Sequence, residues 1–231
     1  MSEIPLWPDK LTREQQRASR QRGKDFTAAL RRQARAANWR YAGGWIFRQA
    51  GDWFVDGFPC LLWGRGAALR LLVKPMALDP LFWDIVGVGE NRSLPLSFRA
   101  NGAWVLRPAT IDSHVGLDLT DVESLAAEVL RSAGRQAAEL LESISIESML
   151  AALPAKADLF GQQRVLAICL HILAGQTETA LNLCRISKSE EHPIARGSGF
   201  LTRNLDGSVS TFLDQARDWI VRERRGALRI V

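Results

Sequence analysis

Residues 39–86 read WRYAGGWIFRQAGDWFVDGFPCLLWGRGAALRLLVKPMALDPLFWDIV and contain five of the eight tryptophans of this 231-residue chain. Short aromatic and aliphatic runs alternate there with breaks that contain glycine. Runs of this length between turn residues are typical of strands joined by tight turns. The stretch therefore predicts a tryptophan-rich sheet whose strands follow one another along the chain.

Strands are expected at 45–49, at 53–56 and at 58–63, the last being a separate strand or a continuation of the second. Residues 67–73 are aliphatic and suit a central strand that is buried on both faces. Pro75 ends this strand, because proline cannot donate a hydrogen bond to a ladder.

Further along the chain, Asn101-Gly102 is a dipeptide typical of two-residue turns. It predicts a hairpin between 94–99 and 103–106, and 111–115 is expected to form a last short strand. Because no long helix interrupts these strands, the sheet is expected to be mainly antiparallel.

Helices are expected before and after the sheet. The segment 13–37 lacks proline, begins after Thr12, and fits a helix that Gly23 interrupts or leaves whole. In the C-terminal half we expect helices at 121–142, 144–153, 159–174, 178–186 and 210–224, and a long loop at 188–206. The predicted class is α+β, with an N-terminal helix, a mainly antiparallel sheet and C-terminal helices. The expected parts are 1–38, 39–117 and 118–231, either separate or combined in one domain.

Composition and cysteine usage indicate an intracellular globular protein. Hydrophobic residues make up 47% and charged residues 24% of the chain, and both values are ordinary. The three cysteines lack the spacing of a disulfide framework or a metal site, which favours a reducing cytosol. Neither a signal peptide nor an apolar run that could span a bilayer is visible. We therefore expect a cytoplasmic protein that does not associate with membranes.

The net charge of +5 is concentrated near the N-terminus. Residues 10–40 carry ten Lys or Arg against two acidic residues, a net of +8. With steps of about 100° along a helix, six of these side chains fall within about 60° of one another. They form a basic row of Arg13, Arg17, Arg20, Lys24, Arg31 and Arg35. This row is either an ordinary solvated face or a site for an acidic partner, which is nucleic acid or protein.

Aromatic and basic residues alternate just after this helix. Trp39, Arg40, Trp45 and Arg48 combine the stacking and phosphate-binding types that hold single-stranded nucleic acid. The order of elements expected of an RRM is missing, however, and about half of the tryptophans in a one-sided sheet belong to the core. These four residues join the basic row as candidate partner-binding residues.

Motifs for catalysis, cofactors and metals are missing from the sequence. His114, His171 and His192 lie far apart and lack metal-ligand spacing, and no phosphate loop or GxSxG elbow is present. We therefore expect no cofactor and no metal. Asp79 and Asp84 flank a short helical turn, and acid–base work by them with His114 is one remaining alternative. Asp79 is better explained as an N-cap and Asp84 as a surface or arginine-paired group.

Two parts of the chain resemble known families. The runs GGWIFRQAGDWFVD (43–56), LRLLVKPMALDPLFWDIVG (69–87) and PLSFRANGAWVLRP (95–108) are similar in layout to small bacterial α+β domains found among polymorphic-toxin immunity proteins. The run RVLAICLHILAGQTETALNLC (164–184) resembles one helical hairpin of the tetratricopeptide kind, a repeat that needs about three copies to bury a core. Neither resemblance implies catalytic residues.

The sequence thus favours a non-enzymatic, cytosolic bacterial protein that binds another protein. The resemblance to immunity proteins implies a cognate toxin or effector as that partner. Two alternatives remain open. One is nucleic-acid binding through the basic N-terminal helix, and the other is an enzyme whose site is assembled from residues distant in sequence.

Overall fold

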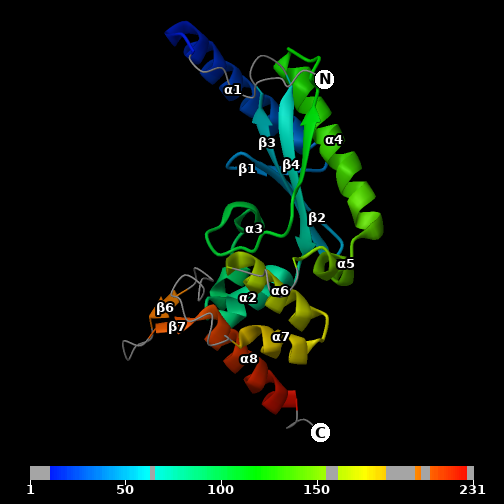
Figure 1. Cartoon of the computed structure of the whole chain (residues 1–231). Helices are drawn as coiled ribbons and strands as arrows, with labels where there is room; N and C mark the ends of the chain where they lie inside the picture. Colours follow the sequence, from blue (N-terminus) through cyan, green and yellow to red (C-terminus); the bar gives the residue numbers. More distant parts are fainter. Residues whose placement is uncertain (1–10, 63–65, 155–160, 186–200, 204–208, 228–231) are drawn as a thin grey trace. The chain divides into compact units, whose positions relative to one another are not determined.

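The computed structural model describes residues 11–62, 66–154, 161–185, 201–203 and 209–227. The chain divides into two compact units, each made from two separate stretches of sequence. Unit 1 comprises Met1–Lys74 with Ala109–Ser143, and unit 2 comprises Pro75–Pro108 with Ile144–Val231. The predicted α+β class is confirmed (Figure 1). The segment expected at 39–117 is shared between the two units.

Unit 1 is built on a five-stranded antiparallel sheet in which each strand pairs with its neighbours in sequence. Its strands are β1 (Arg40–Ala42), β2 (Trp45–Ala50), β3 (Trp53–Leu61), β4 (Ala67–Pro75) and β5 (Ile111–Val115). Gly43 and Gly44 join β1 to β2 with φ of 57° and 88°, a region that glycine occupies at little cost. The predicted run at 58–63 is a continuation of the run at 53–56, because β3 is one continuous strand as far as Leu61. Strand β1 is an additional strand that was not predicted.

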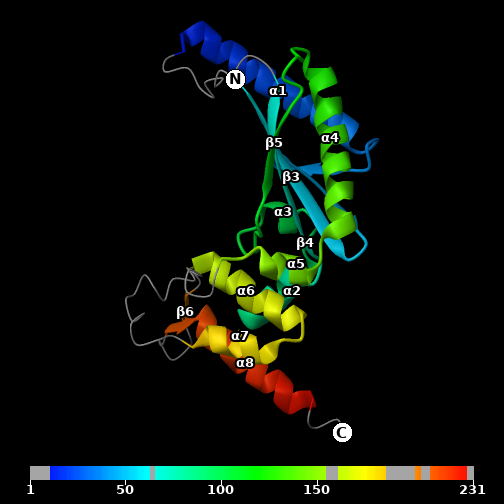
Figure 2. The same ribbon diagram turned by 45° about the vertical axis from the view of Figure 1, so that its right-hand side comes forward.

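Two long helices complete unit 1, α1 (Arg13–Ala34) and α4 (Val122–Ser143). They contact each other, and α4 also contacts β3 and β5, so that it lies along the sheet (Figure 2). Gln136 of α4 donates a hydrogen bond of 3.1 Å to the Ser113 hydroxyl of β5. The possible interruption at Gly23 does not occur. Helix α1 runs unbroken from Arg13 to Ala34, because a single glycine in a helix interior costs only about 1 kcal/mol relative to alanine.

Unit 2 is mainly helical. It contains α2 (Leu78–Ile85), the 3₁₀ helix η1 (Gly89–Ser93), α3 (Phe98–Asn101), α5 (Ile146–Ala151), α6 (Gly161–Leu173), α7 (Thr177–Cys184), β6 (Leu201–Arg203), β7 (Val209–Thr211) and α8 (Phe212–Ala227). Helices α6 and α7 pack together as the expected helical hairpin, and Gly175 between them has φ of 72°. Cys169 of α6 and Cys184 of α7 are both buried, as expected of small core residues.

The predicted hairpin across Asn101-Gly102 is wrong. Its first arm, 94–99, follows η1 and runs into α3, and its second arm, 103–106, forms no strand. Gly102 has φ of −69° and ψ of 157°, so the dipeptide does not adopt the positive φ values of a type I′ turn. Its N–H donates to the Phe98 carbonyl oxygen at 2.7 Å, which ends α3 instead of reversing a strand. The segment after it is held by side chains of α2, because Trp83 Nε1–H donates to the Trp104 carbonyl.

The predicted N-cap role of Asp79 is also wrong. The residue before α2 is Ala77, which makes no side-chain cap, and Asp79 lies inside the first turn with a fully buried side chain. Its Oδ1 accepts the Leu106 N–H at 3.1 Å, and its Oδ2 lies 3.6 Å from the Arg99 guanidinium. Asp79 therefore fixes residues 99–106 against α2, a contact that local sequence patterns do not reveal.

The loop predicted at 188–206 is contradicted in one place. Residues 201–203 form β6, which pairs antiparallel with β7, so a small hairpin leads into α8. The other residues of that predicted loop, 188–200 and 204–206, lie outside the described part of the chain.

Candidate functional site on the basic helix

The start of α1 is fixed locally rather than by packing. The Thr12 hydroxyl accepts the Gln15 N–H at 3.2 Å, and the Gln15 side chain accepts the Thr12 N–H at 2.9 Å, which completes a capping box. The buried residues of α1 all lie in its C-terminal part, namely Phe26, Ala29, Leu30 and Ala34. Residues 13–25 contribute no buried side chain, and Figures 1 and 2 show these turns extending away from the sheet. About half of α1 therefore contributes no residue to the core, and its side that bears the basic row is exposed.

The basic row is exposed along its full length. Arg13, Arg17, Arg20, Lys24, Arg31 and Arg35 are all exposed. At 1.5 Å per residue the row is roughly 33 Å long. Within the described part of the chain, none of the six cations has a carboxylate within ion-pair distance. Like charges at helical spacing repel one another, so this row lowers the stability of α1 unless an anion neutralises it.

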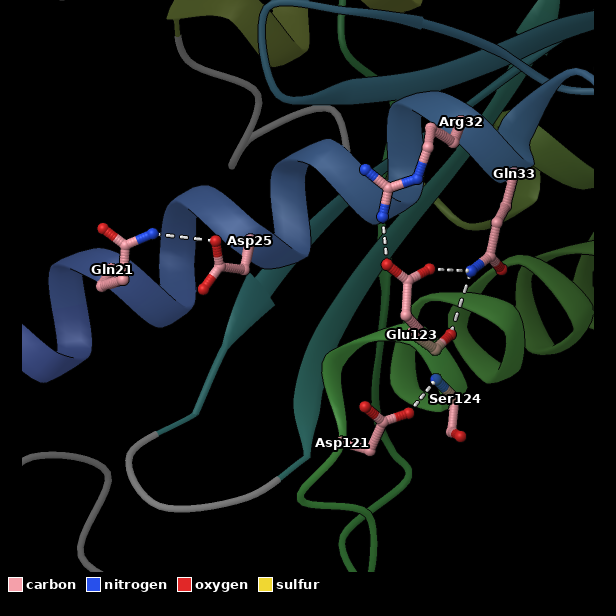
Figure 3. Close-up of polar contacts among 7 residues, drawn as sticks. All are labelled: Gln21, Asp25, Arg32, Gln33, Asp121, Glu123 and Ser124. Carbon is pink, nitrogen blue, oxygen red and sulfur yellow. Dashed lines mark hydrogen bonds and ion pairs between the residues drawn. The ribbon is translucent and has the colours of Figure 1, made fainter.

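Two acidic groups near the row, Asp25 and Glu123, interact with other side chains (Figure 3). Asp25 Oδ1 accepts a hydrogen bond from Gln21 Nε2 at 2.9 Å. Glu123, in the first turn of α4, pairs with Arg32 and accepts from Gln33 Nε2 at 2.8 Å. Arg32 therefore holds α1 against α4 and does not belong to the basic row. The sequence offered no signal for this contact, because its two halves lie 91 residues apart.

The predicted aromatic residues do not offer a stacking surface beside the row. Trp39 is only 2% exposed, and Arg48 lies over its ring with Cζ 4.6 Å from the centroid. Burial lowers the pKa of the Arg48 guanidinium below its ordinary value. Arg31 lies over the Tyr41 ring at 5.8 Å. Of the four residues that follow the row, only Arg40 is exposed. Trp39 is therefore shielded from solvent by its surroundings and Arg48, while Arg48 itself is half-buried.

Trp45 lies on the sheet, in an aromatic pair that was not predicted. Its ring centroid is 4.9 Å from that of Phe58, which follows Gly57 on β3. Phe58 is 38% exposed and Trp45 is half-buried. The strand pairing could have identified Phe58. Ile46 pairs with Gly57 across β2 and β3, so the preceding residue, Trp45, lies opposite the following one, Phe58.

The candidate acid–base residues are used in structural contacts. Asp79 is buried and bonded to the Leu106 N–H, and Asp84 forms an ion pair with Arg92. His114 is exposed on β5 opposite Ala68. In the described residues, no three His, Cys, Asp or Glu side chains are grouped so as to hold a metal ion.

No helix in the described ranges is both long and apolar enough to cross a membrane. No protein family matches the chain, and neither a curated protein nor a solved structure matches it.

Proposed function

We propose that this protein is a non-catalytic binding protein that holds nucleic acid through the basic row of α1. The observation that supports this most is the roughly 33 Å line of six exposed cations, for which no carboxylate partner lies within reach in the described chain. Phosphates supply the missing negative charge, and each contact releases counterions from the nucleic acid.

The composition of the exposed face favours phosphates over a protein surface. Protein interfaces are depleted in charge at their centre and are anchored by buried aromatic residues. The side chains that flank the basic row are Gln16, Gln21, Thr27 and Ala28, and none of these is a large apolar group. The row can therefore attract an acidic partner, but it lacks the apolar anchor that a protein interface needs.

Binding to a labelled 20-base-pair DNA at several salt concentrations tests this function. If all six cations contact phosphates, log K falls with log salt at a slope of about −5. The variant Arg17→Gln/Arg20→Gln is expected to reduce the steepness of that slope by about 2. Arg131→Gln/Arg135→Gln changes the net charge equally on the exposed surface of α4 and serves as the matched control. Binding that both variants weaken equally would overturn the assignment to α1.

A second candidate function is the immunity-type protein binding expected from the sequence, and the Trp45–Phe58 pair favours it. Two adjacent, partly exposed aromatic rings are the kind of anchor that protein interfaces use. If this function is correct, the protein purified from its native host retains one stoichiometric protein partner. The variant Trp45→Ala/Phe58→Ala loses that partner, whereas Arg17→Gln/Arg20→Gln keeps it. Recovery of nucleic acid alone with the wild-type protein would contradict this second function.

A further inference from the structure

The basic row by itself is compatible with single-stranded nucleic acid, duplex RNA and duplex DNA. The residues around the row favour one of these three. We infer that residues 13–25 of α1 enter the major groove of B-form duplex DNA, with Arg31 and Arg35 on the adjoining backbone. This inference rests on the proposed function and specifies its ligand.

The first argument comes from the aromatic residues. Proteins that bind single strands without sequence preference stack bases on exposed aromatic rings beside a basic groove. Here the neighbouring rings are occupied, because Arg48 covers Trp39 and Arg31 covers Tyr41. Single-stranded bases would therefore find charge along α1 but neither of these two rings free, so single strands should gain little beyond the backbone contacts.

The second argument comes from the free length of α1. Residues 13–25 have no buried side chain, and the first packing residue is Phe26, which is 4% exposed. A helix with its side chains is about 10–12 Å wide, and the major groove of B-form DNA is about 12 Å wide. The partly buried Arg22, whose Nη2 is shielded from solvent, lies on the side of α1 opposite the basic row, so the exposed side of this half can enter the groove while Arg22 stays in place.

The third argument separates DNA from RNA. The major groove of A-form RNA is deep and narrow and does not admit side chains in this way. Arg13, Arg17, Arg20 and Lys24 point from one side of the free half-helix, and arginine is the side chain that most often reads guanine O6 and N7 in the major groove. The row is thus suited to contact both the base edges and the flanking phosphates of a major groove, which only the B-form duplex offers at this width.

Fluorescence anisotropy with four probes at one salt concentration tests the inference. The probes are a 20-base-pair DNA duplex, one of its single strands, an RNA duplex of the same sequence, and poly-L-glutamate of matched charge. Duplex DNA is expected to bind at least about ten-fold more tightly than the other three. Protection of guanine N7 from dimethyl sulfate is expected on the bound duplex, because that atom lies in the major groove. Arg17→Gln/Arg20→Gln should abolish this protection, and Arg131→Gln/Arg135→Gln should leave it.

The outcomes separate this inference from the function on which it rests. Equal affinity for the single strand or for duplex RNA, or DNA binding without N7 protection, overturns major-groove binding and leaves nucleic-acid binding intact. Binding to poly-L-glutamate with no binding to any nucleic acid overturns both. Circular dichroism of each variant shows whether α1 remains folded, since Gln preserves helix propensity.

Discussion

The guanidinium of Arg99 lies 3.6 Å from the carboxylate of Asp79 in unit 2, and both side chains are largely shielded from water. Burial lowers the pKa of Arg99, and the Asp79 charge opposes that shift. Arg99 also donates to the Met76 carbonyl at 2.8 Å, while Asp79 accepts the Leu106 N–H. The pair therefore ties three separate parts of unit 2 together.

Removing the Asp79 charge is expected to destabilise unit 2 strongly. Asp79→Asn leaves the Arg99 cation buried without its counter-charge, which costs about 3–5 kcal/mol in comparable buried pairs. Urea unfolding followed by circular dichroism measures this change. Asp84→Asn is the matched control, because its ion pair with Arg92 is exposed and contributes less than about 1 kcal/mol. Similar losses in the two variants would show that the buried pair has no special role.

Replacing Gly23 with alanine is expected to stabilise α1. A Cβ there meets no atom within 4 Å, and alanine is favoured over glycine in a helix interior by about 1 kcal/mol. The thermal midpoint should therefore rise. Gly102→Ala gives the opposite result, since its Cβ would lie 2.4 Å from the Phe98 carbonyl oxygen. A fall in the midpoint of Gly23→Ala would indicate that α1 is bent at this residue.

Breaking the contact between α1 and α4 is expected to affect binding more than stability. Glu123→Gln removes the carboxylate that pairs with Arg32, but both side chains are about half exposed, so the loss of stability is below about 1 kcal/mol. The freed Arg32 cation adds to the charge of α1, and DNA affinity should rise about two- to five-fold at low salt. Chemical denaturation and anisotropy measure the two effects separately. A lower affinity would mean that α1 depends on Glu123 for its orientation.

Acid is expected to weaken the start of α4. Asp121 Oδ2 accepts the Ser124 N–H at 2.8 Å, and this bond lowers the pKa of the carboxyl. Because the folded-state pKa lies below the unfolded value of about 3.9, the ionised group stabilises α4 above that pH. This contribution disappears as the pH falls through the folded-state pKa. The thermal midpoint of Asp121→Asn should therefore converge with that of the wild type as the pH is lowered from 6 to 2. A gap that stays constant would assign the effect to hydrogen bonding alone.

Local patterns were sufficient where neighbouring residues determine the structure. The capping box at Thr12 and the apolar spacing of residues 122–140 identified α1 and α4. The glycine-bounded runs identified β2, β3 and β4. The exposed basic row was also predicted, because its position on the helix follows from the 3.6-residue period alone.

Predictions failed where contacts distant in sequence decide the outcome. Asn101-Gly102 is a strong turn signal, yet Trp83 and Asp79 of α2 bind the backbone that follows it. Trp39 was a candidate partner-binding residue, yet Arg48, nine residues later, lies over its ring. Local propensity is a weak guide wherever buried hydrogen bonds and packing compete with it.

The division of the chain has a consequence for its synthesis. A nascent polypeptide that has reached residue 108 contains β1 to β4 of unit 1 but lacks β5 and α4, which come from 109–143. The outer edge of β4 is then unpaired, and such edges invite pairing with other chains. Unit 1 cannot complete its fold until residue 143 has left the ribosome. Residues 75–108 belong to unit 2, and they cannot complete their packing until residues after 143 have also emerged. Folding of this protein during translation is therefore late and interleaved, and no single cut in the chain separates the two units from each other.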